Sequence, residues 1–323
     1  MQQNKHPTVP SVFVKFAHLL GTQIKNGRIE IPEKFGKGYC AGFVLNEHIR
    51  MLILHYKLNG DLLIENPDSD VDGKMILFKF QNIFPKMEPS SVEKPLKAIP
   101  SVLIVTRQVN TNVAIPVHTN TATINIEVNA HYLDSLFDPS EKSTVLQSLL
   151  QNTQPLLFEQ LIYPSIQKIV DEILTESVDE TFKLFFLRIK AEELVCRLLM
   201  ELEKRDEKHL YALNSKDIQV LYKIKEQMLE HLDCPPLITD LASYAHMSPS
   251  KLKRLFKQIF GNSIFRYYQE FRMKEAARLL REKRSVSEVG YHLGFTNLSH
   301  FANVFEQHMG MKPRDYLKKS SFH

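Results

Sequence analysis

The sequence lacks tryptophan and is poor in cysteine, with three cysteines in 323 residues. Cys40, Cys196 and Cys234 lie far apart and form no CxxC pair, which argues against a disulfide framework and against a cysteine-based zinc site. No apolar run reaches the roughly 18 residues that a membrane helix needs, and the N-terminus does not resemble a signal peptide. We therefore expect a cytoplasmic protein without a membrane partner.

The motifs of the common enzyme classes are also missing. The sequence has no P-loop, no GxGxxG and no GxSxG. A metal-binding cupin site needs clustered histidines, and the histidines of the N-terminal part are isolated from one another in the sequence. Glu47 and His48 with His55 form the nearest group, and a buried or surface role is favoured for them over metal binding. We expect no enzyme, no catalytic or metal-binding residues and no cofactor.

The length and the charge distribution point to two unlike parts. A chain of 323 residues exceeds one ordinary domain. The net charge of +4 is an average, because residues 1–210 carry 23 basic against 26 acidic side chains and residues 211–323 carry 18 against 11. The basic excess of the C-terminal third is typical of a surface that binds a polyanion. A merely solvated basic surface is the alternative that charge alone leaves open.

Residues 1 to about 134 have the pattern of a β-rich domain, which predicts a barrel or a sandwich. Ile124, Ile126 and Val128 alternate with polar residues and should share one face of a strand. Prolines at 85, 89, 95 and 100 indicate a loop. Further strands are expected at 50–58, 74–80, 102–106 and 123–129, with turns at 59–61 and 72–73.

Helical spacing begins near residue 139, so the N-terminal domain should end in helices over about 140–203. Pro139 is suited to start one helix after Asp138, and residues 156–174 and 181–202 show apolar residues at helical spacing. These helices could pack on the β-rich part, or they could form the interface of a homodimer, which we favour. The predicted organisation is α+β, with a sensing or dimerisation domain over 1–205, a linker over 206–216 and an all-helical domain over 217–320.

The C-terminal domain contains an internal repeat with an offset of 48–49 residues. Each copy has the pattern of a helix, a tight turn, a second helix and a glycine stop, as in a helix-turn-helix motif. In both copies a small residue suits the helix crossing, a residue tolerant of positive φ suits the turn, and a polar residue suits the cap of the second helix. These residues are Ala242, His246, Ser248 and Gly261 in the first copy and Gly290, Gly294, Asn297 and Gly310 in the second.

The second helix of the first copy, expected over 249–260, has a basic outward face. Such a helix can lie in the major groove of DNA, where Ser250, Lys253 and Arg254 would face base edges and Lys251 and Lys257 would neutralise phosphates. A solvated basic face is the alternative, but the repeated turn pattern favours DNA.

The corresponding helix of the second copy, expected over 297–309, has no basic side chain other than histidine. Ser299, His300 and Asn303 are its candidate base contacts, and Glu306 is unfavourable near phosphate. The helix expected over 263–281 would join the two copies rigidly. Its inward face should hold Phe265, Tyr268, Met273, Ala276, Ala277 and Leu280. Other helices are expected at 217–231, 237–245, 286–293 and 313–318.

The repeat resembles the AraC/XylS family of bacterial transcription regulators over about 217–318. The resemblance implies sequence-specific binding to double-stranded DNA, contact with RNA polymerase, and an N-terminal domain that senses a small molecule and dimerises. The sequence departs from the family where Asn303, Glu306 and Leu317 stand in place of basic residues, which predicts a weaker second copy.

The N-terminal domain is less distinctive. Residues 182–203, after 156–174, resemble siderophore-responsive members grouped with the pyochelin regulator. The effector and its binding residues do not follow from this short match. An N-terminal domain that binds no small molecule, and that acts through dimerisation or a protein partner, is the alternative.

Overall fold

The chain folds into two compact units, each built on one side of residue 214. The first unit ends at Asn214 and combines a sheet with helices, and the second begins at Ser215 and is helical. The computed structural model describes residues 9–60, 62–64, 74–84, 100–106, 115–117, 120–138, 142–205 and 207–320.

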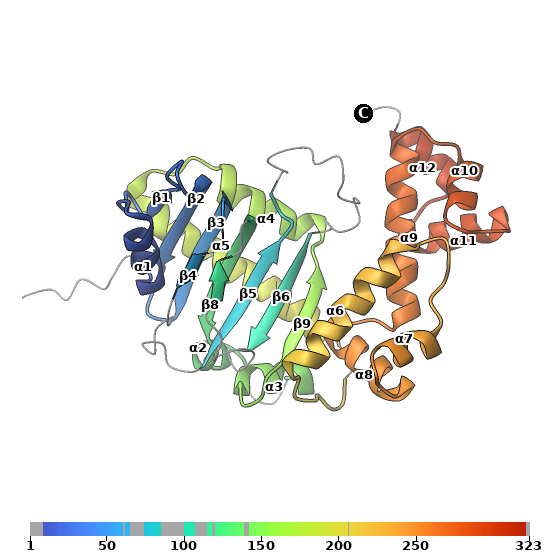
Figure 1. The fold of residues 1–323 in the computed structure, drawn as a ribbon, viewed down its shortest axis with the longest axis horizontal. Helices are drawn as coiled ribbons and strands as arrows, with labels where there is room; N and C mark the ends of the chain where they lie inside the picture. The colour runs from blue at the N-terminus through green and yellow to red at the C-terminus, as the bar shows by residue number, and fades with distance from the viewer. Residues whose placement is uncertain are drawn as a thin grey trace, which may run out of the picture. The chain divides into compact units, whose positions relative to one another are not determined.

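A seven-stranded antiparallel sheet forms the centre of the first unit in the part of the chain that is described (Figure 1). Its order is β1-β2-β3-β8-β5-β6-β9, and β4 pairs with β7 in a separate ribbon. The strands are β1 (Arg28–Glu30), β2 (Gly36–Val44), β3 (Ile49–Leu58), β4 (Leu62–Ile64), β5 (Met75–Gln81), β6 (Ser101–Thr106), β7 (Ile115–Val117), β8 (Asn120–Asn129) and β9 (Leu157–Leu161). The α+β class is as predicted. The sheet has β1 and β9 at its edges, which differs from the closed barrel or paired sheets that we expected.

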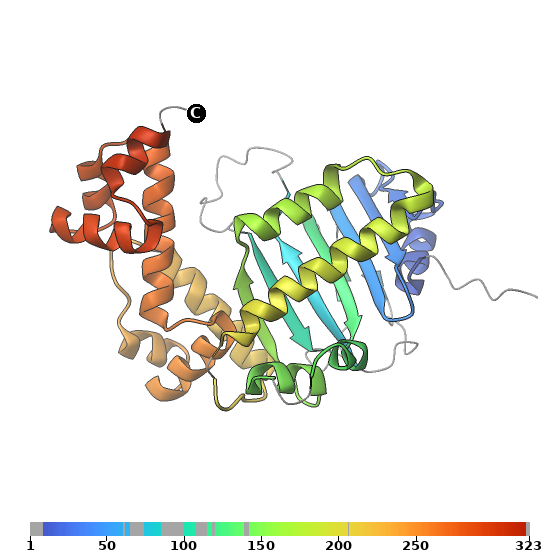
Figure 2. The ribbon, with the colours of Figure 1, turned by 180° about the vertical axis from the view of Figure 1, so that it is seen from behind.

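Two helices cover one face of this sheet, α4 (Pro164–Thr175) and α5 (Glu180–Glu203) (Figure 2). Beneath them lies the main core, to which β8 contributes Ile124, Ile126 and Val128, all buried as their alternation predicted. Because strand side chains alternate between faces, every second residue of the central strands points to these helices and the others point to the opposite face.

The opposite face is covered at one end by α1 (Ser11–Leu20). Phe13 and Phe16 of α1 pack in a second cluster with Tyr56 and Leu58 of β3. The approach is close at Gly42 of β2, where a Cβ atom would lie 2.9 Å from the Phe13 ring. The short helices α2 (Ala130–Ser135) and α3 (Thr144–Gln151) complete the unit.

The helix predicted over residues 156–174 was wrong in its first part. Residues 157–161 form edge strand β9, with Phe158 fully buried in the sheet core, and α4 begins only at Pro164. The apolar residues of this stretch fit both the strand period of two residues and the helix period of 3.6 residues. Pro164 disfavours helical conformation in the residue before it. The helix predicted at 181–202 is confirmed as α5.

Some predicted features lie outside the described residues. These are the start at Pro139, the prolines at 85, 89 and 95, His6, His118, Asp61 and the turn at 72–73. The next helix that is described, α3, begins at Thr144, and the Ser143 side chain accepts a hydrogen bond from the backbone N–H of Leu146 at its start.

The second unit consists of short helices that match the predicted series within two residues at each end. They are α6 (Ser215–Glu230), α7 (Ile238–Tyr244), α8 (Pro249–Phe260), α9 (Ile264–Arg281), α10 (Val286–His292), α11 (Leu298–Met309) and α12 (Pro313–Ser320). None of the described helices combines the length and the apolar composition that crossing a bilayer requires.

Candidate nucleic-acid interface

The turn between α7 and α8 has the geometry that its sequence predicted. His246 has a φ of 50°, and its N–H donates to the Ser243 carbonyl while the next N–H, of Met247, donates to the Ala242 carbonyl. The Ser248 side chain then accepts from the Lys251 N–H at the start of α8. Pro249 follows at the first helical position, where a missing N–H costs nothing.

The turn between α10 and α11 repeats this hydrogen-bond pattern. The N–H of Gly294 donates to the Tyr291 carbonyl, and the N–H of Phe295 donates to the Gly290 carbonyl. A Cβ atom on Gly290 would lie 2.7 Å from a methyl group of Leu298, so a small residue is required where α10 crosses α11. The internal sequence repeat is therefore also a structural repeat.

Helix α9 packs on both helix pairs. The Tyr268 hydroxyl donates to the His231 carbonyl before α7, at 3.2 Å, and burial raises the pKa of Tyr268 to about 12, so the donor stays protonated. Farther along α9, the Arg272 guanidinium donates to the Leu293 carbonyl at the end of α10 and lies 4.0 Å from the centre of the Phe295 ring. These contacts fix the two helix pairs to one rigid element.

The inward face predicted for α9 is confirmed in all but one position. Tyr268, Met273, Ala276, Ala277 and Leu280 are buried. Phe265 is 55% exposed, which contradicts its predicted place in the core. It lies in the first turn of the helix.

The outward face of α8 presents the predicted polar residues. Ser250, Lys253 and Arg254 are exposed, and Lys257 is half-buried. The opposite side of α8 holds Leu252, Leu255, Phe256 and Ile259, all of which are buried. Lys251 differs from the others because its ammonium forms an ion pair with Asp217 of α6, at 3.0 Å.

Helix α11 presents Ser299, His300 and Asn303, all of which are exposed. The Asn297 side chain accepts from the His300 N–H at the start of the helix, as expected of a cap. Phe301 and Phe305 are buried, Val304 and Met309 are half-buried, and His308 is exposed. The two second helices thus have the same orientation in their repeats but different charge.

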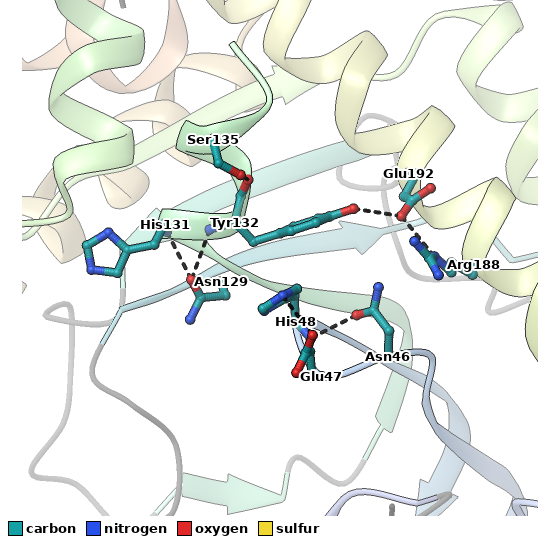
Figure 3. A network of polar contacts seen from close by, with 9 residues as sticks. All are labelled: Asn46, Glu47, His48, Asn129, His131, Tyr132, Ser135, Arg188 and Glu192. Carbon is teal, nitrogen blue, oxygen red and sulfur yellow. Dashed lines mark hydrogen bonds and ion pairs between the residues drawn. The ribbon is translucent and has the colours of Figure 1, made fainter.

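His48 and His55, the histidines weighed above for a metal site, do not lie close to each other. His48 stacks on the ring of Tyr132, whose hydroxyl donates to Glu192 of α5, and Arg188 donates to the same carboxylate (Figure 3). His55 lies seven residues farther along, or about 23 Å at the usual rise of a strand. Among the described residues no set of three potential ligands is close enough to hold a metal ion.

Comparison with known proteins gives matches for the C-terminal unit. A family model described as a helix-turn-helix domain matches residues 241–319. The transcriptional regulator GbdR of Pseudomonas aeruginosa is 32% identical over 109 residues, which cover 33% of this chain and 29% of that protein. The transcriptional activator RhaR of Yersinia pseudotuberculosis is 34% identical over 84 residues, which cover 25% and 29%. The C-terminal unit contains a helix-turn-helix domain of the AraC type.

A solved structure of an AraC-type regulator from Chromobacterium violaceum is 29% identical, with a TM-score of 0.31 over 33% of this chain and 96% of that one. The chain spans about a third of the length of the curated relatives that it matches. Those relatives are transcriptional regulators, in agreement with the expectation of a non-enzyme. The resemblance of the N-terminal helices to siderophore-responsive members stays a prediction.

Three contacts of the AraC-type domain were not foreseen from the sequence. They are the pair of Lys251 with Asp217, the bond from Arg272 to the Leu293 carbonyl, and the close approach of Gly294 to the Asp233 carbonyl. Each joins residues 21 to 61 positions apart, for which single-sequence periodicity carries no signal. The sequence signal that could have indicated one of them is Arg272, a charged residue on the inward face of α9, where it is buried.

Proposed function

We propose that this protein is a sequence-specific transcription regulator that binds double-stranded DNA through α8 and α11, set in adjacent segments of the major groove. The observation that supports this most directly is the repeated turn geometry combined with the basic, exposed face of α8. In the proposal, residues 1–205 form the sensing or dimerisation domain, 206–216 the linker and 217–320 the DNA-binding domain.

Helices α8 and α11 are proposed to contribute unequally to DNA binding. Ser250, Lys253 and Arg254 of α8 are proposed to read base edges, with the two basic side chains on guanine. Lys257 is proposed to neutralise a phosphate. Lys251 has the same proposed role, and its ion pair with Asp217 must be shared with that phosphate. On α11, Ser299, His300 and Asn303 are proposed to make weaker, neutral contacts.

Loss of Lys253 or Arg254 tests the proposal. A specific duplex is first selected from a random-sequence pool with the full-length wild-type protein. Binding of Lys253→Ala and Arg254→Ala to this duplex should weaken about 5- to 150-fold, the equivalent of ~1–3 kcal/mol for one good base contact. Gel-shift titration and footprinting measure the loss.

Lys223→Ala is the matched control, because it removes the same charge from an exposed position of α6. The control should bind the selected duplex nearly as the wild type does. Undiminished protection of the duplex by both α8 variants would contradict the assignment of α8 as the main reading helix.

The role of the first unit is a further part of the proposal. A small-molecule effector that binds in this unit would control DNA binding, RNA polymerase would be the partner at the promoter, and a bacterial cytoplasm would be the location. The alternative, in which the unit binds no small molecule and acts only by dimerisation or through a protein partner, is tested below.

The outward side of α5 supports dimerisation. Phe182, Phe185, Ile189 and Met200 are exposed large apolar residues at helical spacing, with exposed fractions of 61%, 64%, 45% and 61%. Together with Cys196, which is also exposed, they form an apolar stripe along the helix. We propose that the α5 stripe packs on the same stripe of a second copy.

Charge favours an antiparallel arrangement of the two α5 helices. Residues 180–191 carry three basic and one acidic side chain, whereas residues 192–203 carry four acidic and one basic. An antiparallel pair places the basic half of each helix over the acidic half of its partner, and a parallel pair opposes like charges. A register shifted by one residue from the one that superposes the halves places Phe182 against Met200 of the second copy.

Crosslinking distinguishes the two arrangements. In a Cys196→Ser, Cys234→Ser background, Phe182→Cys mixed with Met200→Cys should form an intermolecular disulfide under mild oxidation. The Phe182→Cys variant alone should not. Disulfides formed by that variant alone would indicate parallel packing, and a monomer in sedimentation at micromolar concentration, with and without DNA, would contradict the dimer.

A further inference from the structure

The sheet face turned away from α4 and α5 carries a small cluster of polar side chains at its centre. Lys79 of β5 is paired in register with Asn125 of β8, and Gln81 is paired with Thr123 two residues along. Apolar residues flank two of them, since Leu103 lies beside Lys79 on β6 and Leu52 lies beside Asn125 on β3. Ser101 flanks Gln81, and Glu127 follows Asn125 on the same face of β8. Polar side chains enclosed by apolar ones are the usual composition of a small-molecule site.

Lys79 is half-buried and has lost much of its hydration. Burial lowers its pKa, and no carboxylate among the described residues offsets this effect. An ammonium that loses water without gaining a counter-charge is unfavourable. An anion supplied from outside would restore the missing interaction.

Two more polar atoms of this group lack partners. The Thr123 hydroxyl and the Asn125 side-chain oxygen are shielded from water, and neither has a hydrogen-bond partner in the described structure. Buried polar atoms are normally satisfied, and exceptions call for an explanation such as a bound molecule. The Gln81 amide next to them donates to Ser101 at 2.9 Å and is satisfied.

We propose that Lys79, Asn125 and Thr123 bind a small, partly apolar organic acid that carries a hydroxyl group. The carboxylate accepts from the Lys79 ammonium, the hydroxyl pairs with Asn125 and Thr123, and the apolar part lies on Leu52 and Leu103. The assignment rests on the proposed sensing role of the first unit and names the chemistry of its effector.

Thermal stability of the full-length protein tests the site without DNA. The probes are a series of hydroxy acids from lactate to mandelate, with mandelamide and phenylacetate as analogues of mandelate that lack the charge or the hydroxyl. At millimolar concentration at least one hydroxy acid should raise the melting temperature of the wild type. Mandelamide and phenylacetate should shift it less than mandelate does.

Lys79→Met should abolish this response, whereas the matched control Lys57→Met, an exposed strand lysine of β3, should keep it. Should Lys79→Met fail to fold, protection of the Lys79 amine from reductive methylation by the active acid, read by mass spectrometry, replaces it. Absence of any shift across the series, or equal shifts in the wild type and a folded Lys79→Met, would overturn the site.

DNA binding is measured separately so that the two hypotheses can fail independently. Lys79→Met should bind the selected duplex with unchanged affinity when no acid is present. An acid that stabilises the wild type but leaves its DNA affinity unchanged would support the site and contradict the sensing role.

Discussion

At the residue scale, packing explains why the second turn of the AraC-type domain has Gly294 where the first turn has His246. Both positions have positive φ, 76° at Gly294 and 50° at His246. A Cβ atom on Gly294 would lie 1.9 Å from the Asp233 carbonyl oxygen, a contact that no backbone adjustment of a few tenths of an ångström relieves. Glycine there is required both by conformation and by packing.

Replacement of Gly294 by alanine should therefore destabilise the second helix pair by ~3 kcal/mol or more, since a backbone clash adds to the ~1–2 kcal/mol of left-handed conformation. Gly310→Ala is the matched control, because Gly310 has a φ of 72° but open space around its Cβ position. It should cost only ~1–2 kcal/mol. Hydrogen exchange of the α10 and α11 amides measures the difference, and equal effects would refute the packing argument.

The roles of single residues were well predicted where they depend only on neighbours in the sequence. The caps Ser248 and Asn297 and the stops Gly261 and Gly310 depend only on neighbouring backbone, and all have the expected geometry. Residues whose role depends on distant partners were not foreseen. Lys251 was interpreted as a phosphate contact, and nothing in the sequence indicated its ion pair with Asp217.

At the scale of elements, α9 holds the two helix pairs in register. Its Arg272 donates to the Leu293 carbonyl at the end of α10 and lies over the Phe295 ring, so it substitutes for the missing helical partner of that carbonyl. Burial lowers the pKa of Arg272, yet a guanidinium stays charged at neutral pH.

Arg272→Met keeps the volume of the side chain but leaves the Leu293 carbonyl without its donor, so it should destabilise the second pair by ~2–3 kcal/mol. DNA contacts of α11 should weaken while those of α8 persist. Arg281→Met, an exposed position of the same helix, is the control. Footprints of both variants on the selected duplex measure this, and a uniform loss along the whole site would argue against a local role.

Helices of the second unit were predictable because they have amphipathic patterns, and because α8, α9, α10 and α11 also begin at a side-chain cap. In the first unit the same rules failed at residues 157–161, which are strand although the adjacent residues continue a helical pattern. An edge strand next to a helix is decided by pairing with a distant strand, here β6, which local sequence does not encode. Strands β1 and β2 pair with their neighbours in the sequence, but the three glycines of β2 weaken its strand pattern, and both strands were missed.

At the scale of the whole molecule, charge is distributed to match the proposed roles. The basic excess lies in the second unit, and within its two second helices the lysine and arginine side chains lie on α8 and not on α11. The polar group around Lys79 and the α5 stripe lie in the other unit, on opposite sides of its sheet. Composition indicated the division, but the sites within the first unit became visible only from the register of the sheet.

Methylation interference on the selected duplex, with the full-length wild-type protein, tests the central claim most directly. The account predicts two clusters of interfering guanines, methylated at N7 in the major groove, about one helical turn apart, with the stronger cluster lost in Arg254→Ala and the weaker one lost in Asn303→Ala. A single cluster, or two clusters that both disappear equally in each variant, would contradict two separate reading helices of unequal strength.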